Sequence, residues 1–411
     1  MSIPIDLVYD YIAGYVNYDV IIYRWTPPGS KNIGDLQPLQ HYQRHWRDTR
    51  PVMICHDQEP LDWSLYNSQH TLQWIQDDFC RYWQVEKTSE AWPWTTDRVL
   101  QSWVQPNEIT NVNQKMLLLH SEFRSSAVEL SRSMGWCPVH IWSHGIIAQD
   151  WFRYARYDQS LHVSTTQRAD FLIYSRAWSG SREYRLWFLD QLVQQDLVSV
   201  CTVRFNPCDQ GSMYHQHQFS DVQWQCSPRW SADIFYHNSV PAWASATYDA
   251  ADYCQHFIEI VLETVVDRTH LTEKVCRPIA CGKPFMLAAG QGALQYLRDY
   301  GFRTFAPWIN ESYDLESDNK KRLQMIIDEM HKIIRMSPRD RLNLIANINQ
   351  VARYNQRHFF NDAFLDNIMQ DFGQQYMAAC LELGHQSPGD ATWQKYLYEN
   401  YPDVTKLLGK A

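Results

Sequence analysis

Short apolar runs recur along this chain of 411 residues, separated by polar stretches rich in turn-forming residues. Such runs predict buried strands, and strands that alternate with helical patterns are typical of parallel sheets. The predicted strands are residues 5–9, 20–23, 51–55, 116–120, 138–142, 170–174, 198–203, 257–262 and 285–289. Helical patterns cover residues 35–50, 122–134, 318–336, 338–356, 360–382 and 391–408. The pattern predicts an α/β protein with a helical C-terminal end and a polar linker at 154–168.

The stretch 257–290 is the most informative one, because it combines a strand, a loop, a helix and a second strand. Thr272 is a good helix N-cap, and Glu273 follows in the first turn, where the helix dipole favours a carboxylate. Gly282 suits the position that closes a helix, and Pro284 prevents its continuation. A helix N-terminus that faces the end of a buried strand is a potential anion site, and Lys274 adds a positive charge to it.

The amino-acid composition limits the possible classes of function and indicates the cellular compartment. The formal net charge is −9, so no global positive field attracts nucleic acid or an anionic membrane. The ten cysteines contain no C-x-x-C pair, which indicates neither a zinc site nor a disulfide framework and favours a reducing cytoplasm. No long apolar stretch predicts a signal peptide or a membrane span. We therefore expect a cytoplasmic protein without a metal.

Acidic residues follow the predicted strand 51–55 at the position where α/β sheets bind ligands. Asp57 and Glu59 lie there, and Pro60 ends the strand because it lacks an N–H. The sequence therefore places both carboxylates at the mouth of the predicted sheet.

A second strand–loop–helix unit begins after the linker. The strand 170–174 leads into a Ser/Gly loop with arginines, which can hold a diphosphate through backbone N–H groups and guanidinium groups. The chain lacks the G-x-G-x-x-G pattern of dinucleotide-binding proteins, and this counts against a dehydrogenase.

The segment Thr272-Glu273-Lys274, followed by Ala280-Cys281-Gly282-Lys283-Pro284, resembles the donor-binding segment of GT-B glycosyltransferases, and is closest to the fucosyltransferase-like group. The continuation 290–314 is similar to glycosyltransferase-like proteins of bacteriophages and marine bacteria. The resemblance implies two Rossmann-like domains that face a cleft, with C-terminal helices. The implied domains are an acceptor domain at 1–160, a nucleotide-sugar domain at 169–340, and helices at 341–411 that pack back across the domains.

The same resemblance implies roles for individual residues. The catalytic base falls on Glu59, with Asp57 as the close rival. Glu263 corresponds to one glutamate of the two-glutamate donor motif of many GT-B enzymes, although the spacing there is shorter. The implied donor-binding residues are Arg176, Arg182 or Arg185, Glu263, Thr272, Glu273 and Lys274.

We therefore expect an inverting, metal-independent glycosyltransferase that uses a nucleoside-diphosphate sugar and no cofactor. The acceptor is either a glycan or a hydroxymethylated pyrimidine in phage DNA, in which case the enzyme works in the host cytoplasm. Arg44, Arg47 and Arg50 form a local basic patch that could hold DNA phosphates, and His144 either bonds the substrate or is a structural histidine. The alternative is a non-catalytic sugar- or nucleotide-binding protein on the same fold.

Overall fold

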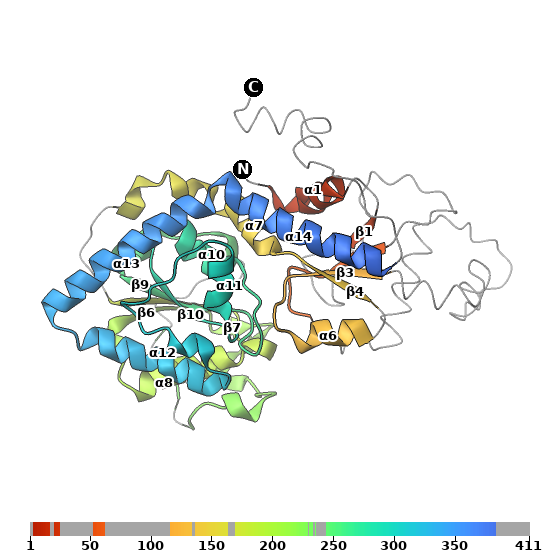
Figure 1. Cartoon of the computed structure of the whole chain (residues 1–411). Coiled ribbons are helices and arrows are strands. Elements are labelled where there is room, and N and C mark those ends of the chain that lie inside the picture. The colour runs from red at the N-terminus through yellow and green to blue at the C-terminus, as the bar shows by residue number, and fades with distance from the viewer. Residues whose placement is uncertain are drawn as a thin grey trace. The chain divides into compact units, whose positions relative to one another are not determined.

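The computed structural model describes residues 3–16, 20–24, 52–61, 116–133, 136–162, 169–228, 230–232, 235 and 244–383 (Figure 1). The chain forms two compact units. The first unit comprises Ile5–Ser143 and Met369–Ala411, and the second comprises Met1–Pro4 and His144–Ile368. The division thus falls at Ser143 and not within the polar stretch 154–168. The predicted helices at 35–50 and 391–408 lie outside the described residues.

The first unit contains a parallel sheet with the strand order β1-β2-β3-β4. Its strands are β1 (Ile21–Arg24), β2 (Val52–Cys55), β3 (Met116–His120) and β4 (Cys137–His140). The strands predicted at 20–23, 51–55 and 116–120 are confirmed. The fourth begins one residue earlier than predicted and ends at His140, so Ile141 and Trp142 lie outside it.

The strand predicted at 5–9 is wrong, because this segment is helical. A 3-10 turn, η1 (Ile5–Leu7), leads into α1 (Val8–Tyr15). The buried side chains of α1 include Val8 and Tyr9, which lie four and three residues before the buried Ile12, as on one face of a helix. The short apolar run alone has no period that separates a strand from a helix, and the spacing becomes clear only beyond residue 9.

The C-terminal part of α14 (Asp362–Glu382) belongs to the first unit from Met369 onward. The ring of Phe372 lies 5.7 Å from that of Tyr15 in α1. The backbone N–H of His140 donates to Gln375 at 3.0 Å, and the ring of His140 lies 3.2 Å from Asp371. The end of α14 therefore covers β4 and α1. The remaining described helix of this unit is α6 (Ser126–Ser133).

The second unit contains a Rossmann-like parallel sheet with the strand order β10-β9-β5-β6. Its strands are β5 (Phe171–Ser175), β6 (Cys201–Phe205), β9 (Ile258–Leu262) and β10 (Phe285–Ala288). Every residue of β5, β9 and β10 is buried, as expected for a parallel sheet that is covered on both faces. Because the chain moves from β5 to one side and then returns to the other, the order reverses between β5 and β9. Ligands of open α/β sheets bind at the carboxyl ends of the strands at such a reversal.

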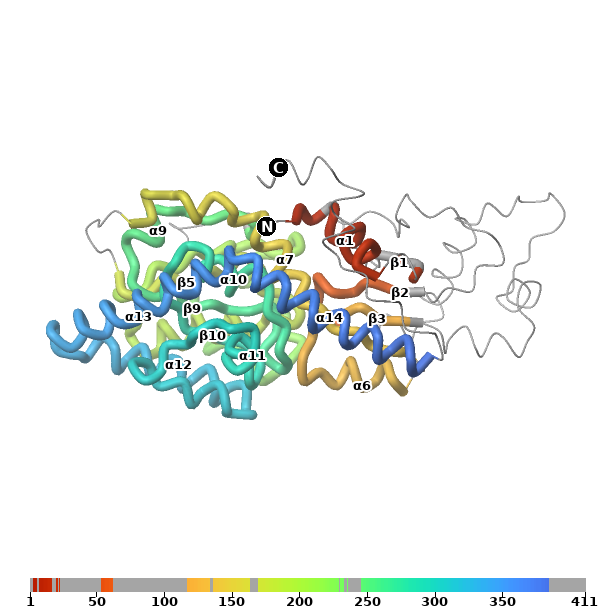
Figure 2. The backbone as a smooth tube through the Cα atoms, turned by 45° about the horizontal axis from the view of Figure 1, so that its top comes forward, coloured from red at the N-terminus to blue at the C-terminus, as the bar shows by residue number. Residues whose placement is uncertain are grey.

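Helices surround this second sheet. Figure 2 shows α13 crossing in front of β5 and β9 on the side where α10 lies, and α10 packs against both α13 and β9. The helices are α7 (Ser143–Trp151), α8 (Tyr184–Gln194), α9 (Ala250–Gln255), α10 (Glu273–Ala280), α11 (Ala293–Asp299), α12 (Asn319–Ile334), α13 (Pro338–Phe359) and the start of α14. The short 3-10 turns of the second unit include η2 (Arg153–Arg156), η3 (Gln159–His162), η4 (Gly180–Arg182), η5 (Val198–Val200), η6 (Tyr214–Gln216), η7 (Val222–Trp224), η9 (Ala244–Ala246) and η10 (Ser312–Leu315).

The structure confirms the prediction that α10 is terminated by Gly282. Gly282 has φ of 64°, in the left-handed region where a side chain is strained. The N–H of Gly282 donates to Ile279 at 3.0 Å, and that of Lys283 donates to Pro278 at 2.9 Å. These two bonds form a Schellman motif, which turns the chain sharply into β10.

Candidate functional site

The candidate site lies at the carboxyl ends of β5 and β9, where the strand order reverses. Arg185 of α8 links the loop that follows β5 to the loop that follows β9. Its guanidinium donates to the carbonyl of Ala177 at 2.6 Å, after β5, and to those of Leu262 and Glu263 at 2.9 and 2.6 Å, after β9. Arg185 is 1% exposed, so we assign it to holding the loops in place.

Glu263 is fully buried and fills the N-terminus of α10 with its own carboxylate. One oxygen accepts the N–H groups of Thr272 and Val275 at 3.1 and 3.3 Å. The other accepts the hydroxyl of Thr272 at 2.7 Å and the N–H of Thr264 at 3.2 Å. Burial raises the pKa of Glu263. The backbone donors that the sequence suggested for an external anion are thus partly taken by Glu263.

Thr272 is the N-cap of α10, as predicted, and accepts the N–H of Lys274 at 3.4 Å. The ammonium of Lys274 lies 3.1 Å from the hydroxyls of Thr264 and Thr272 and 3.0 Å from the carboxylate of Glu273. Its side chain keeps 22% of its surface exposed. Lys274 therefore presents a positive charge at the edge of the sheet, on a rigid first helical turn.

Glu273 and His144 form a buried pair beside Lys274. The Nε2 atom of His144 lies 3.7 Å from the Glu273 carboxylate, and both side chains are less than a tenth exposed. Burial alone would raise the pKa of Glu273, but the charge of the adjacent Lys274 holds it well below its ordinary value. Burial lowers the pKa of His144 to about 4, although Glu273 opposes this shift.

His144 was expected at the end of a strand, but it lies in the first turn of α7. Its Nδ1 atom is buried and has no hydrogen-bond partner among the described residues. The ring packs edge-on against His270, with centroids 5.6 Å apart. With the proton on Nε2, which faces Glu273, Nδ1 carries a lone pair that can accept a hydrogen bond from a ligand hydroxyl.

We expect His144 to make the second unit sensitive to acid. Its folded pKa of about 4 lies below the unfolded value of 6.5, so unfolding takes up a proton below pH 6.5. The stability is thus fully present above pH 6.5 and is lost as the pH falls toward 4, by up to ~3 kcal/mol. Chemical denaturation at several pH values should show a shallower loss for His144→Gln than for the wild type. The exposed His162→Gln is the control, and an equal slope in all three proteins would contradict the assignment.

Arg176 supplies a second cation at the end of β5. Its guanidinium lies 4.7 Å from the ring centre of Tyr174, and no ion pair or side-chain hydrogen bond holds it among the described residues. The Nε atom is buried without a partner. Burial and the nearby charge of Arg277 lower the pKa of Arg176 to about 10, so it stays protonated at neutral pH. An anionic ligand group would satisfy this guanidinium.

The loop after β5 is organised by Asp209, a residue that the sequence did not single out. One oxygen of Asp209 accepts the N–H groups of Trp178 and Ser179 and the Ser179 hydroxyl, each at 2.7 Å. These two N–H groups are therefore occupied, and a phosphate here would rely on side-chain cations. Asp209 is the last residue of β7 (Cys208–Asp209), which forms a short hairpin with β8 (Ser212–Met213), and the Asp-Gln-Gly sequence of this turn was the only local signal. Arg182, a predicted phosphate ligand, lies in η4 of the same loop.

The two candidate bases lie together after β2 in the first unit but differ in environment. Asp57 is 1% exposed and accepts a hydrogen bond from Tyr9 at 2.8 Å. Its backbone carbonyl accepts the Ser143 hydroxyl at 3.0 Å. Glu59 is exposed. The buried carboxylate of Asp57 is thus fixed, whereas that of Glu59 faces solvent.

Further polar residues that the sequence analysis missed follow the neighbouring strand. Glu122, after β3, accepts the N–H of Leu61 at 2.6 Å and so closes the loop that carries Asp57 and Glu59. The rings of His120 and His140 lie 5.7 Å apart at the ends of β3 and β4. Burial, followed by the charge of His140, lowers the pKa of His120 well below its ordinary value. The sequence could have indicated these residues by their position, because each lies at or just after the end of a predicted strand.

Arg44, Arg47 and Arg50 lie outside the described residues. No described helix is long and apolar enough to cross a membrane. No cluster of three or more metal-ligating side chains occurs in the described part of the chain. Comparisons with protein-family models, with curated proteins and with solved structures found no match to this chain.

Proposed function

We propose that this protein is a glycosyltransferase that transfers a sugar from a nucleoside-diphosphate donor to an acceptor hydroxyl. The observation that carries the proposal is the Glu273–Lys274 turn at the carboxyl end of β9, beside the loop after β5. Parallel α/β sheets bind ligands at such a reversal of strand order. The resemblance of this segment to the donor-binding segment of GT-B enzymes supports the same conclusion, and the GT-B arrangement of the two units is part of the proposal.

In this proposal Lys274 and Arg176 bind the donor diphosphate. Lys274 is partly exposed, and Arg176 lacks an ion-pair partner among the described residues. Two cations at the end of one sheet stabilise the departing diphosphate and need no metal for that role. The amides of α10 contribute less than the sequence suggested, because Glu263 already binds two donors there. Glu263, Thr272 and Arg185 act as positioning residues.

Glu273 and His144 are the proposed contacts of the sugar. Charges nearby keep Glu273 ionised, so its carboxylate accepts hydrogen bonds from sugar hydroxyls. The free Nδ1 of the neutral His144 accepts another. Such buried acceptors reject an analogue without the hydroxyl, because its loss leaves them unpaired.

The proposed base is Asp57 or Glu59, and the two are separated by conservative variants. Loss of a general base lowers the transfer rate by roughly 100- to 10,000-fold. We therefore expect this loss in either Asp57→Asn or Glu59→Gln, with donor binding unchanged in both. Transfer rates and donor titrations measure the two effects separately. Unchanged transfer in both variants would exclude both carboxylates as the base.

The acceptor is proposed as a glycan or as a hydroxymethylated pyrimidine in DNA. A non-catalytic sugar- or nucleotide-binding protein is the second candidate, because the same cations and acceptors would serve binding alone. Release of nucleoside diphosphate from a bound donor separates the two. Turnover supports the transferase, and stable binding without turnover in the presence of both acceptor classes supports the binding protein.

A thermal-shift panel of nucleoside-diphosphate sugars and free diphosphates tests the donor site. We expect one nucleotide class to raise the melting temperature. Lys274→Ala should weaken that binding about 10- to 100-fold, because a charged hydrogen bond to phosphate is lost. Lys321→Ala, on the exposed surface of α12, is the matched control. The absence of any shift in the wild type, or equal shifts in wild type and Lys274→Ala, would contradict the proposed site.

A further inference from the structure

A surface of arginine and tyrosine side chains lies on the second unit and includes none of the residues assigned to the donor. We call it the Arg/Tyr surface. It is made by η2 with the residue that follows it and by the second half of α13. Its members are Arg153, Tyr154, Arg156, Tyr157, Arg353 and Arg357.

The two tyrosines are far more exposed than a ring of this size usually is. Tyr154 is 66% exposed and Tyr157 is 69% exposed. Each carries a neighbouring guanidinium near its ring, with Arg153 at 4.6 Å from Tyr154 and Arg156 at 5.4 Å from Tyr157. The arginine orients the ring through a cation–π contact. A second flat molecule can then stack on the ring.

The positive charge of this surface is largely uncompensated. Arg153 pairs with Asp150 at 3.2 Å, but Arg156, Arg353 and Arg357 are exposed and have no acidic partner among the described residues. Between Arg341 and Asn361 the sequence of α13 contains no Asp or Glu. A chain with a net charge of −9 thus carries a local region of the opposite sign.

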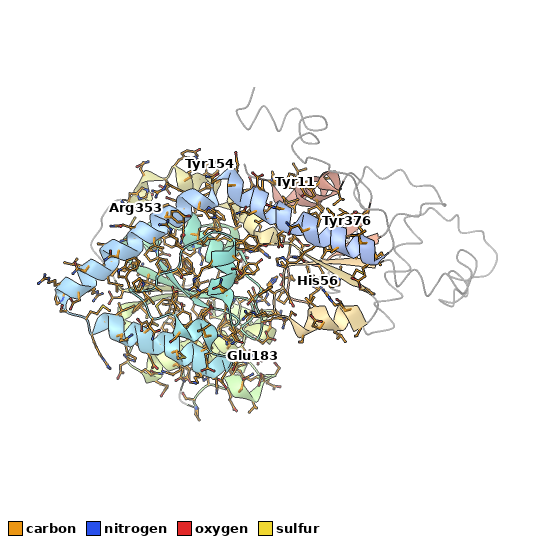
Figure 3. The ribbon with its side chains drawn as sticks, in the orientation of Figure 1. Tyr11, His56, Tyr154, Glu183, Arg353 and Tyr376 are labelled. Carbon is orange, nitrogen blue, oxygen red and sulfur yellow. The ribbon has the colours of Figure 1, made fainter. Side chains whose placement is uncertain are left out.

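The two parts of the surface are joined through α10. This helix packs against both η2 and α13. Lys283, which follows Gly282, donates to the carbonyl of Leu161 in η3 at 2.9 Å. Burial, with a smaller contribution from the charge of Arg353, lowers the pKa of Lys283. Figure 3 shows the labelled Tyr154 and Arg353 on the same side of this unit. Tyr154 and Arg353 therefore lie on one side of the second unit, and their segments, η2 and α13, both pack against α10.

We propose that the Arg/Tyr surface binds a single strand of nucleic acid. Exposed aromatic rings stack on unpaired bases, and unpaired arginines neutralise the phosphates between them. A polyanion without bases would contact the arginines but would not stack on the tyrosine rings. The proposal needs none of the residues assigned to the donor site. If both proposals hold, this surface directs the choice of acceptor toward nucleic acid.

Fluorescence anisotropy with a labelled oligothymidylate tests the proposal on the full chain. The affinity of the wild type should fall as salt rises from about 50 to 200 mM. The double variant Tyr154→Ala/Tyr157→Ala should weaken binding by roughly 30-fold or more, since each of the two stacked bases contributes about 1–3 kcal/mol. The pair Arg156→Gln and Arg353→Gln should reduce the salt slope by about 1.4, at ~0.7 for each phosphate contact.

Controls separate this surface from general charge and from the donor site. Arg335→Gln removes an exposed arginine at the end of α12, and Leu315→Ala removes an exposed apolar side chain in η10, so both should bind like the wild type. All variants of the Arg/Tyr surface should keep the nucleotide affinity of the wild type. Conversely, Lys274→Ala should lose nucleotide affinity and keep its affinity for oligothymidylate. No binding at the lowest salt, equal binding in the tyrosine pair, or equal affinity for heparin and oligothymidylate would each overturn the proposal.

Discussion

Replacing Arg277 by methionine is expected to lower the free energy of unfolding of the second unit by about 3–5 kcal/mol. Arg277 and Glu259 form an ion pair of 2.5 Å between side chains that are 2% and 1% exposed. Arg277 also donates to the hydroxyl of Tyr253 at 3.0 Å and lies 4.1 Å from the ring centre of Tyr174. Its loss leaves the Glu259 charge buried without its cation, which is the costly part of the change.

A double variant separates the cost of the unpaired charge from the value of the pair. Arg277→Met combined with Glu259→Leu removes both charges, so it should recover most of the stability that Arg277→Met loses. Lys321→Met breaks the exposed pair with Glu316 and should show no measurable change. Chemical denaturation measures all of these variants. An Arg277→Met protein as stable as the wild type would show that Glu259 is not held as an ionised partner.

Glu263→Ala is expected to have the second large effect, at about 3–5 kcal/mol of stability with loss of nucleotide binding. The carboxylate accepts four hydrogen bonds from Thr264, Thr272 and Val275. Alanine leaves these donors buried without an acceptor, and each such donor costs about 1–3 kcal/mol, not fully additively. The first turn of α10, and Lys274 with it, should then lose its fixed position.

Glu263→Gln is the matched control, because it keeps one acceptor oxygen and the length of the side chain. We expect a smaller loss of stability than in Glu263→Ala and partial nucleotide binding. Denaturation and calorimetric titration give the two quantities independently. If Glu263→Ala unfolds like the wild type, the carboxylate does not hold the loop and our assignment of its role is wrong.

Local sequence rules predicted the helix–strand frame of the candidate site well. Thr272 caps α10, and Gly282 closes it, because both features depend on residues within one turn of the chain. The parallel sheets followed from buried apolar runs that alternate with helices. Gly290 was not singled out, yet a Cβ there would lie 2.1 Å from the backbone carbon of Arg268, a contact set by packing of two distant loops.

The roles of the charged residues depended on contacts that no local pattern contains. Arg185 was expected to bind phosphate, yet it bonds to the carbonyls of two loops that lie far apart in sequence. Glu263 was expected to touch the donor, yet it binds the first turn of α10. The role of Asp209 could be identified only from the structure, in which its carboxylate accepts the N–H groups of Trp178 and Ser179. Whether a charge in such a loop is structural or faces a ligand is decided by its partners across the sheet.

The most direct test of the central claim is a titration of the nucleoside diphosphate against wild type, Arg176→Ala, Lys274→Ala and the double variant. If both cations bind one diphosphate, each single variant weakens binding about 10-fold or more, and the double variant departs from the sum of the two effects. Melting temperatures of the free proteins confirm that all four are folded. Unchanged affinity in either single variant would contradict a diphosphate held between the ends of β5 and β9.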